Sequence, residues 1–224
     1  MNTHTLVAGL VLAIGSNAVA GSFTGSASIN VDVLAVNGTP QMTTGTVDTV
    51  GVQPGDTILF AINGEITGTA IPGDFIQFAI IRLAPVGEFG FVDPGSITLA
   101  PALESIISSP RVFDDPDTPT PNDDNGLNLQ TFRLPGAPDS SLGTGGQLFT
   151  FEFTVTADAG EFSYDTLVVP GPTDPENRLV AGGPDFNKYL ITETTADRIV
   201  IPSPSAIACF GLVGGFAATR RRRA

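Results

Sequence analysis

The segment from 114 to 126 holds the residues that are best suited to bind a metal ion. Its aspartates and asparagines carry the oxygen ligands that Ca²⁺ prefers. The segment does not fit an EF-hand, because placing Gly126 at the sixth position puts Pro121 at the first and Phe132 at the twelfth. A calcium site and a solvated acidic surface loop both remain open. The candidate ligands are Asp114, Asp115, Asp117, Asp123 and Asp124.

The chain holds few of the residues that common catalytic mechanisms need. His4 is the only histidine, and it lies in a segment that we expect to be removed on export. Its loss excludes Ser-His-Asp and Cys-His catalysis and histidine-dependent zinc or iron sites. A glycosidase with two carboxylates remains open, although the chain has no Trp for sugar stacking. We therefore assign no catalytic residue, expect a protein that is not an enzyme, and expect no cofactor apart from Ca²⁺.

Charge and cysteine content limit the partners and the source of stability. Between the two terminal segments described below, six basic residues stand against 23 acidic ones, which gives a formal charge of −17. Such a surface repels nucleic acid and attracts cations. The only cysteine, Cys209, lies in the C-terminal apolar run, so the body of the protein forms no internal disulfide. Its stability must come from its core and from any bound cations.

The N-terminus has the features of a secretory signal peptide. A short apolar run, Leu6–Ile14, is followed by Ala18-Val19-Ala20 and then Gly21. Small residues at Ala18 and Ala20 are typical of the cleavage site of such peptides. We expect residues 1–20 to be removed and the chain to be exported.

The C-terminus combines a polar, proline-containing stretch, an apolar run and a cluster of positive charge. Ile201, Pro202, Ser203, Pro204 and Ser205 precede the apolar residues 206–218. As a helix, residues 202–219 would span roughly 27 Å, close to the hydrocarbon thickness of a bilayer. A permanent anchor and a segment that is retained transiently and then processed both remain open. The positive cluster, which resists translocation, is Arg220, Arg221, Arg222 and Arg223.

This tail resembles a PEP-CTERM sorting signal, the bacterial C-terminal element that an exosortase recognises. Residues 201–205 stand where that family has Val-Pro-Glu-Pro-Ser, with Ser203 in place of the glutamate. The apolar helix and the arginine cluster follow in the same order. The resemblance implies export through the secretion machinery, a transient membrane anchor at residues 201–224, and an exosortase-type processing enzyme as a partner.

Residues 21–200 are expected to form one domain of short strands and turns. Ile29, Val31 and Val33 alternate with polar residues, and Phe149, Phe151, Phe153 and Val155 share one face of a strand. Asn37-Gly38 and Pro54-Gly55-Asp56 predict turns, and Asn63-Gly64 predicts a break in the strand that begins at Thr57. Further strands are expected at 75–81, 129–134, 162–169, 186–192 and 198–201, with a short helix within 102–107. The pattern predicts an all-β, two-sheet antiparallel sandwich, flanked by an N-terminal signal helix and a C-terminal hydrophobic helix.

Two stretches of this domain resemble cohesins. Val52–Ile58 is similar to an early strand of that family, and Gly146–Val155 with Ala157-Asp158-Ala159 is similar to its penultimate strands. The resemblance implies a jelly-roll sandwich that binds dockerin modules or serves as a surface-attached spacer. No binding residue is carried over.

The sequence therefore predicts an exported, non-catalytic protein of the cell surface or extracellular matrix. Its sandwich would be a structural, adhesive or binding module, with exopolysaccharide or other surface proteins as partners. The alternative is a secreted domain that binds or cleaves carbohydrate, which requires a concave groove and, for cleavage, a close pair of carboxylates.

Overall fold

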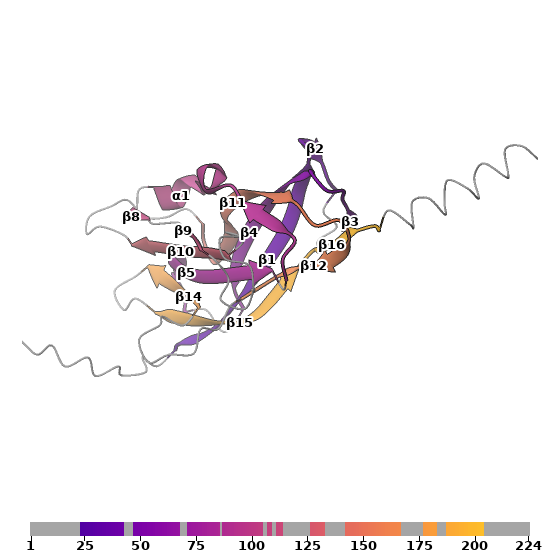
Figure 1. The fold of residues 1–224 in the computed structure, drawn as a ribbon. Coiled ribbons are helices and arrows are strands. Elements are labelled where there is room, and N and C mark those ends of the chain that lie inside the picture. Colours follow the sequence, from indigo (N-terminus) through magenta and orange to yellow (C-terminus); the bar gives the residue numbers. More distant parts are fainter. Residues whose placement is uncertain are drawn as a thin grey trace, which may run out of the picture.

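The computed structural model describes residues 23–42, 47–67, 71–85, 87–104, 107–108, 111–113, 126–132, 142–166, 177–182 and 187–203. Strands dominate these residues, and their helical elements are the one-turn helix α1 (Pro101–Glu104) and the 3-10 turn η1 (Pro94–Ser96) (Figure 1). The predicted all-β class is confirmed. The predicted flanking helices fall in segments 1–20 and 204–224, outside the described residues.

The first layer of the sandwich is built around β4, which pairs antiparallel with β1 on one side and β11 on the other. Short strands β6 and β7 extend this layer beyond β11, and β2 folds back on β1. The predicted turn between β1 and β2 is present: Asn37 and Gly38 have φ of 49° and 73°, which a tight hairpin requires. The strands are β1 (Gly25–Val36), β2 (Thr39–Pro40), β4 (Thr57–Ile66), β6 (Gly90–Val92), β7 (Thr98–Leu99) and β11 (Gly145–Val155).

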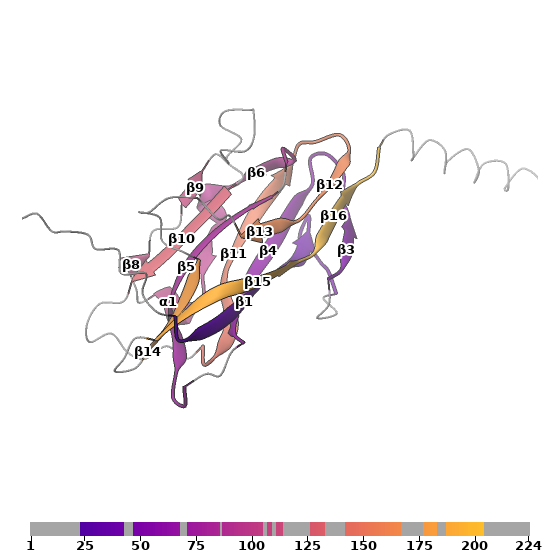
Figure 2. The same cartoon turned by 90° about the horizontal axis from the view of Figure 1, so that it is seen from below.

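The second layer is built around β5, which pairs with β14, β10 and β13. Strand β15 follows β14, while β8 and β9 both pair with β10. Figure 2 shows β5, β10 and β14 side by side in this layer. The strands are β5 (Phe75–Pro85), β8 (Ile107–Ser108), β9 (Arg111–Phe113), β10 (Gly126–Phe132), β13 (Tyr164–Thr166), β14 (Arg178–Gly182) and β15 (Lys188–Ala196).

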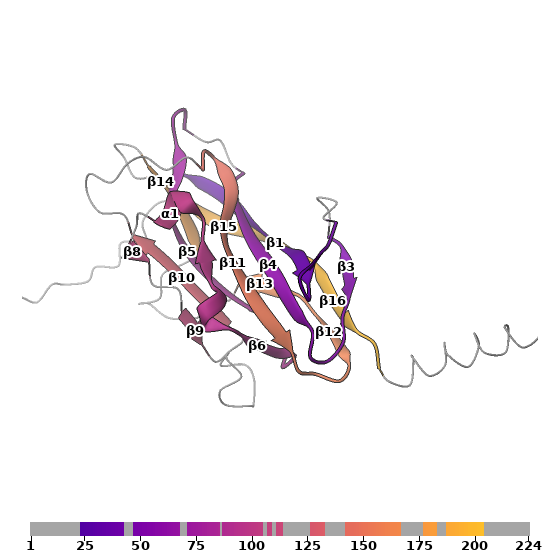
Figure 3. The same ribbon diagram turned by 90° about the horizontal axis from the view of Figure 1, so that it is seen from above.

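A small third sheet lies at the end of the molecule opposite to α1 and β8 (Figure 3). It consists of β12 (Gly160–Phe162), β16 (Arg198–Ile201) and β3 (Thr49–Gly51), with β16 in the middle. The strand predicted for 198–201 is therefore present, and it ends where the predicted sorting motif begins.

The prediction that all strands pair antiparallel is wrong. β1 pairs parallel with β15, and β16 pairs parallel with β3. The β1–β15 pair also joins the two layers by hydrogen bonds, so they form one continuous sheet folded over on itself. Parallel partners need a long connection, and here most of the domain lies between them. Hydrophobic alternation gives the faces of a strand but not the direction of its distant partner.

Aromatic side chains fill the space between the layers. Phe60 of β4 stacks on Phe151 of β11 at 5.2 Å between ring centroids, and Tyr164 of the opposite layer meets both rings edge-on at 5.3 Å. Edge-to-face contacts of this kind stabilise by about 1 kcal/mol beyond the burial of area. The face predicted for β11 is confirmed, because Phe149, Phe151, Phe153 and Val155 are all buried.

The predicted break at Asn63-Gly64 is wrong, because β4 continues through both residues to Ile66. Gly64 pairs with Ile29 of β1 and with Gly146 of β11, so it lies in the centre of the layer. A Cβ added to Gly64 would lie 2.8 Å from Leu148 Cδ1. Close packing, rather than a turn, explains the glycine.

Candidate functional site

The junction between the sandwich and the predicted sorting motif is held by a buried aspartate. The Asp197 carboxylate accepts hydrogen bonds from the backbone amides of Val33 and Asp48, both at 2.8 Å. Asp197 is 3% exposed, so its loss would leave both amides unsatisfied at a cost of about 1–3 kcal/mol each. The carboxylate thus fixes the corner between β15 and β16 against β1 and the segment before β3.

Strand β16 is anchored along its whole length. Ile199 and Ile201 are buried in the core, and the Val200 carbonyl accepts a 3.0 Å hydrogen bond from the Val52 amide. Arg198 donates two hydrogen bonds to the Glu161 carboxylate, which lowers the pKa of Glu161 and raises that of Arg198. Both side chains are about half exposed, so solvent weakens this ion pair.

The structure describes the first three residues of the predicted sorting motif. Ile201 is 2% exposed and belongs to the core, whereas Pro202 is exposed and Ser203 is half-buried. The chain therefore leaves the sandwich between Ile201 and Pro202. Pro204, Ser205 and the cluster Arg220, Arg221, Arg222 and Arg223 lie outside the described residues, as do Ala18, Ala20 and Gly21 of the predicted signal cleavage site.

The other sequence-predicted segments have no test in the described part of the chain. Asp114, Asp115, Asp117, Asp123 and Asp124 lie outside it, so the calcium site stays a prediction. In the described ranges, no three His, Cys, Asp or Glu residues come together as a metal site. Nor do those ranges contain a helix of sufficient length and hydrophobicity to cross a bilayer.

A polar groove of about 480 Å³ lies on the outer face of β1, β4 and β11. The strand register builds it in two rows. Ser28, Glu65 and Gly145 face one another across the three strands, and Asn30 and Asn63 form the next row. Residues opposite each other in antiparallel strands have Cβ atoms about 5 Å apart, so each row presents its groups together. Thr144 lines the end of the groove at the start of β11.

The two asparagines of the groove are held by Asp32. The Asp32 carboxylate accepts hydrogen bonds from Asn30 Nδ2 at 2.8 Å and from Asn63 Nδ2 at 2.7 Å. Burial raises the pKa of Asp32 above its ordinary value of 3.8; Asp197 and Asp48 raise it further, and the two asparagines oppose the shift. Because an ionised carboxylate only accepts hydrogen bonds, it fixes both amides with their nitrogens toward Asp32.

Fixing the amides determines which groups the groove presents. The Asn30 carbonyl oxygen accepts a 2.9 Å hydrogen bond from the Thr195 hydroxyl. Three side-chain groups have no hydrogen-bond partner in the described part of the chain: the amide oxygen Oδ1 of Asn63, the Ser28 hydroxyl and the Glu65 carboxylate. Gly145 leaves room beside Glu65, because an added Cβ would lie 3.3 Å from Glu65 Cγ. The groove is thus a hollow with unpaired donors and acceptors on its walls.

Neither tyrosine offers a platform for sugar stacking. Tyr164 and Tyr189 are 2% and 0% exposed, and both belong to the core. The Tyr189 hydroxyl donates to the Asp74 carboxylate at 2.5 Å; burial and this bond raise the pKa of Tyr189. Burial alone raises the pKa of Tyr164.

Sequence reasoning did not identify the groove. The alternating Asn30 and Asp32 predicted a polar outer face for β1, but the partners of this strand lie far along the chain. Asn63 was part of the predicted break, so its place opposite Asn30 could not be inferred. The only available signal was the continuous polar stripe on β1.

The sequence matches no protein-family model, and it matches no curated protein. The described residues form an all-β sandwich with a polar groove on one outer face.

Among solved structures, the chain is similar to cohesins, the family that the sequence resembles. A chain of the Coh-OlpA–Doc918 type I cohesin–dockerin complex from Clostridium thermocellum is 13% identical, with 78% of this chain and 99% of that chain covered and a TM-score of 0.46. The sixth cohesin of scaffoldin B from Acetivibrio cellulolyticus, in complex with a Cel5 dockerin, is 9% identical. The match covers 79% of this chain and 99% of that chain, with a TM-score of 0.47. A non-cellulosomal cohesin from the archaeon Archaeoglobus fulgidus is 12% identical, with 79% of this chain and 92% of that chain covered and a TM-score of 0.43. The properties of the groove come from this chain's own residues.

Proposed function

We propose that this protein is an exported, non-catalytic component of the cell surface or extracellular matrix. Residues 1–20 are its signal peptide, residues 21–200 its sandwich domain, and residues 201–224 a PEP-CTERM-like sorting segment that an exosortase-type enzyme processes. The sandwich acts as the structural, adhesive or binding module that remains outside the cell. Its partners are exopolysaccharide or other surface proteins, and not nucleic acid.

The observation that carries this proposal is the position of the junction. Strand β16 keeps the chain in the core up to Ile201, and the exposed part of the motif begins at the next residue, Pro202. A processing enzyme can therefore reach the motif while the sandwich remains folded. Asp197 and the pairing of β16 with β3 hold the domain together close to the point of attachment.

The carboxylates near the groove support a non-catalytic role. Asp32 is paired with Ala61 of β4, and Glu65 lies four residues further along that strand. At about 3.3 Å per residue, the two carboxylates are roughly 13 Å apart along the sheet. Glycosidases place theirs roughly 5–9.5 Å apart, and they need one carboxyl group free to donate a proton. The Asp32 carboxylate is instead engaged by two amides.

The test is the intact mass of the protein recovered from the cell exterior. Both ends should be missing, which lowers the mass by about 2 kDa at each end. A variant with Arg220, Arg221, Arg222 and Arg223 all changed to Gln should lose correct retention and processing. The control variant carries Arg111→Gln and Lys188→Gln in the sandwich and should be processed normally. Recovery of the unprocessed chain, with its leader, from the cytosol would contradict the proposal.

The second candidate function, binding of carbohydrate, is favoured by the groove on β1, β4 and β11. It is compatible with the first, because a matrix protein that is exported and processed also needs a means of contact with the matrix. This second candidate function does not include hydrolysis, because the Asp32 and Glu65 carboxylates lie too far apart to act as a glycosidase pair.

A further inference from the structure

The groove presents both hydrogen-bond donors and acceptors. The Ser28 and Thr144 hydroxyls can donate or accept, while the Glu65 carboxylate and the Asn63 carbonyl oxygen only accept. None of these groups has a partner within the described residues. A sugar hydroxyl also donates and accepts, so a ligand with several hydroxyls would satisfy the walls, whereas an apolar ligand would leave them unpaired.

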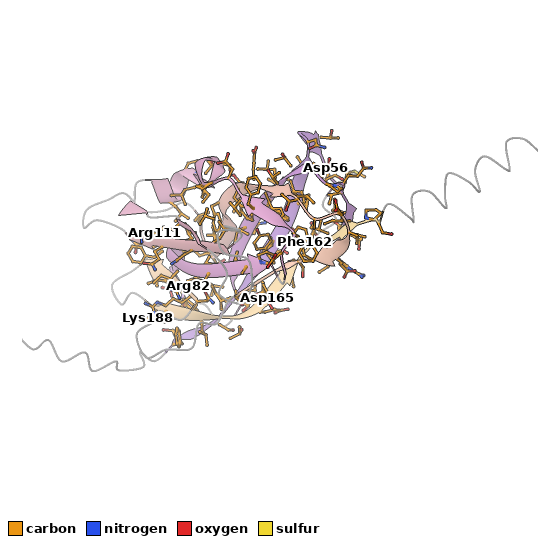
Figure 4. All side chains as sticks on the ribbon, in the orientation of Figure 1. Asp56, Arg82, Arg111, Phe162, Asp165 and Lys188 are labelled. Carbon is orange, nitrogen blue, oxygen red and sulfur yellow. The ribbon has the colours of Figure 1, made fainter. Side chains whose placement is uncertain are left out.

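The charge of the groove selects against anionic ligands. Glu65 lies on its wall, the Asp32 carboxylate accepts hydrogen bonds from the two asparagines, and no Lys or Arg is found among its lining residues in the described part of the chain. Figure 4 shows the labelled basic side chains Arg82, Arg111 and Lys188 together at the end of the molecule away from Asp56. These residues belong to β5, β9 and β15 rather than to the strands of the groove. A polymer of acidic sugars would therefore meet like charge in the groove.

The shape of the groove depends on a glycine, which has no side chain to fill the hollow. On the outer face, Gly145 is the neighbour of Glu65 on β11. Its Cβ would have contacts of 3.3 Å with Glu65 Cγ and 3.4 Å with the Gly64 carbonyl oxygen. Gly145 is not among the positive-φ residues, so a larger side chain there would fill the hollow without backbone strain. The volume of about 480 Å³ lies within the range of small-ligand sites.

From these features we infer that the groove binds the hydroxyl groups of a neutral polysaccharide. Glu65 and the Asn63 carbonyl oxygen accept hydrogen bonds from the sugar, and the Ser28 and Thr144 hydroxyls complete the contacts. Asp32 holds Asn63 in the orientation that turns its carbonyl oxygen away from the carboxylate. The inference rests on the proposed binding role of the sandwich but not on the route of export, so the two can fail separately.

The experiment uses the full chain in a detergent without a sugar head group. The probes are neutral hexasaccharides of β-1,4-glucan, β-1,3-glucan, α-1,4-glucan and β-1,4-mannan, with a hexasaccharide of uronic acid as the charged comparison. Glu65→Gln should weaken binding of the neutral probe about tenfold, because a charge-assisted hydrogen bond is replaced by a weaker one. Gly145→Val should abolish binding by filling the hollow. Glu152→Gln, the same charge change on the outer face of β11 but outside the groove, should leave binding within about twofold.

Titration calorimetry and ligand-observed NMR give the affinities, and thermal melting shows that each variant is folded. Binding of at least one neutral hexasaccharide that depends on Glu65 and Gly145 supports the inference. It is overturned if no neutral probe binds, if both groove variants bind like the wild type, or if the uronic acid probe binds as tightly. Binding without export would remove the sorting proposal alone, and export without binding would remove only the groove.

Discussion

Two Asn-Gly dipeptides, Asn37-Gly38 and Asn63-Gly64, have the same composition but different structures. In both, the asparagine Nδ2 donates to a carboxylate at 2.7 Å, to Asp56 in the first and to Asp32 in the second. The first pair forms an exposed hairpin turn with positive φ at both residues. The second pair continues through a central strand and contributes to the wall of the groove.

The difference shows that neighbours distant in the sequence decide the conformation of a local motif. No atom lies within 4 Å of a Cβ built on Gly38, so only the turn acts on that residue. A Cβ on Gly64 would meet both Leu148 of β11 and Leu179 of β14, which lie on opposite layers. Packing between layers therefore holds the second pair in a strand, although its intrinsic preference is for a turn.

The largest effect is expected from Gly64→Ala. The new methyl group would lie 2.8 Å from Leu148 Cδ1 and 3.3 Å from Leu179 Cδ1, so the core must shift. We expect a loss of about 2–3 kcal/mol in the free energy of unfolding, measured by urea denaturation. In a Leu148→Ala background the same change should cost much less, because the 2.8 Å clash is removed and only the 3.3 Å contact with Leu179 Cδ1 remains. Equal costs in both backgrounds would contradict the proposed packing.

Some strands could be predicted from their own sequence, without knowledge of the strands with which they pair. The alternation in β1 and β11 and the run at 198–201 specify a strand and its buried face by themselves. The continuity of β4 could not be predicted, because it depends on Leu148 and Leu179, more than 80 residues further on. The same is true of the groove, since Ser28, Glu65 and Gly145 come from three separate segments and meet only through the register of the sheet.

A smaller effect is expected from Asn63→Asp, with Asn37→Asp as its counterpart at the exposed turn. Each change replaces a hydrogen bond to a carboxylate with a second negative charge. Asp32 is partly buried, and burial already raises its pKa, so the added charge should raise that pKa further. We expect Asn63→Asp to cost about 1–2 kcal/mol at pH 7, and Asn37→Asp less than about 1 kcal/mol because solvent and salt screen the exposed pair.

The pH dependence of Asn63→Asp tests whether charge at Asp32 is the cause of its cost. A carboxyl group with a raised pKa in the folded state contributes stability below its unfolded pKa, and this contribution is lost as the pH rises through the folded value. The deficit of Asn63→Asp should therefore shrink as the pH is lowered from 7 toward about 4, and it should depend weakly on salt. Denaturation curves at several pH values and salt concentrations provide the measurement. A deficit that is the same at pH 7 and pH 4 would show that charge at Asp32 is not its cause.

A small effect is also expected from Gly38→Ala, which tests the turn in isolation. Gly38 has a φ of 73°, and the added methyl group would contact nothing, so the whole cost is the left-handed backbone, about 1 kcal/mol. Gly51 is a matched control, because a Cβ there also meets nothing within 4 Å and its φ is not positive. Gly51→Ala should be neutral or slightly stabilising, since alanine restricts the unfolded chain. If the two variants have the same free energy of unfolding, backbone conformation does not explain the glycine at 38, and the contrast between the two Asn-Gly pairs loses its physical basis.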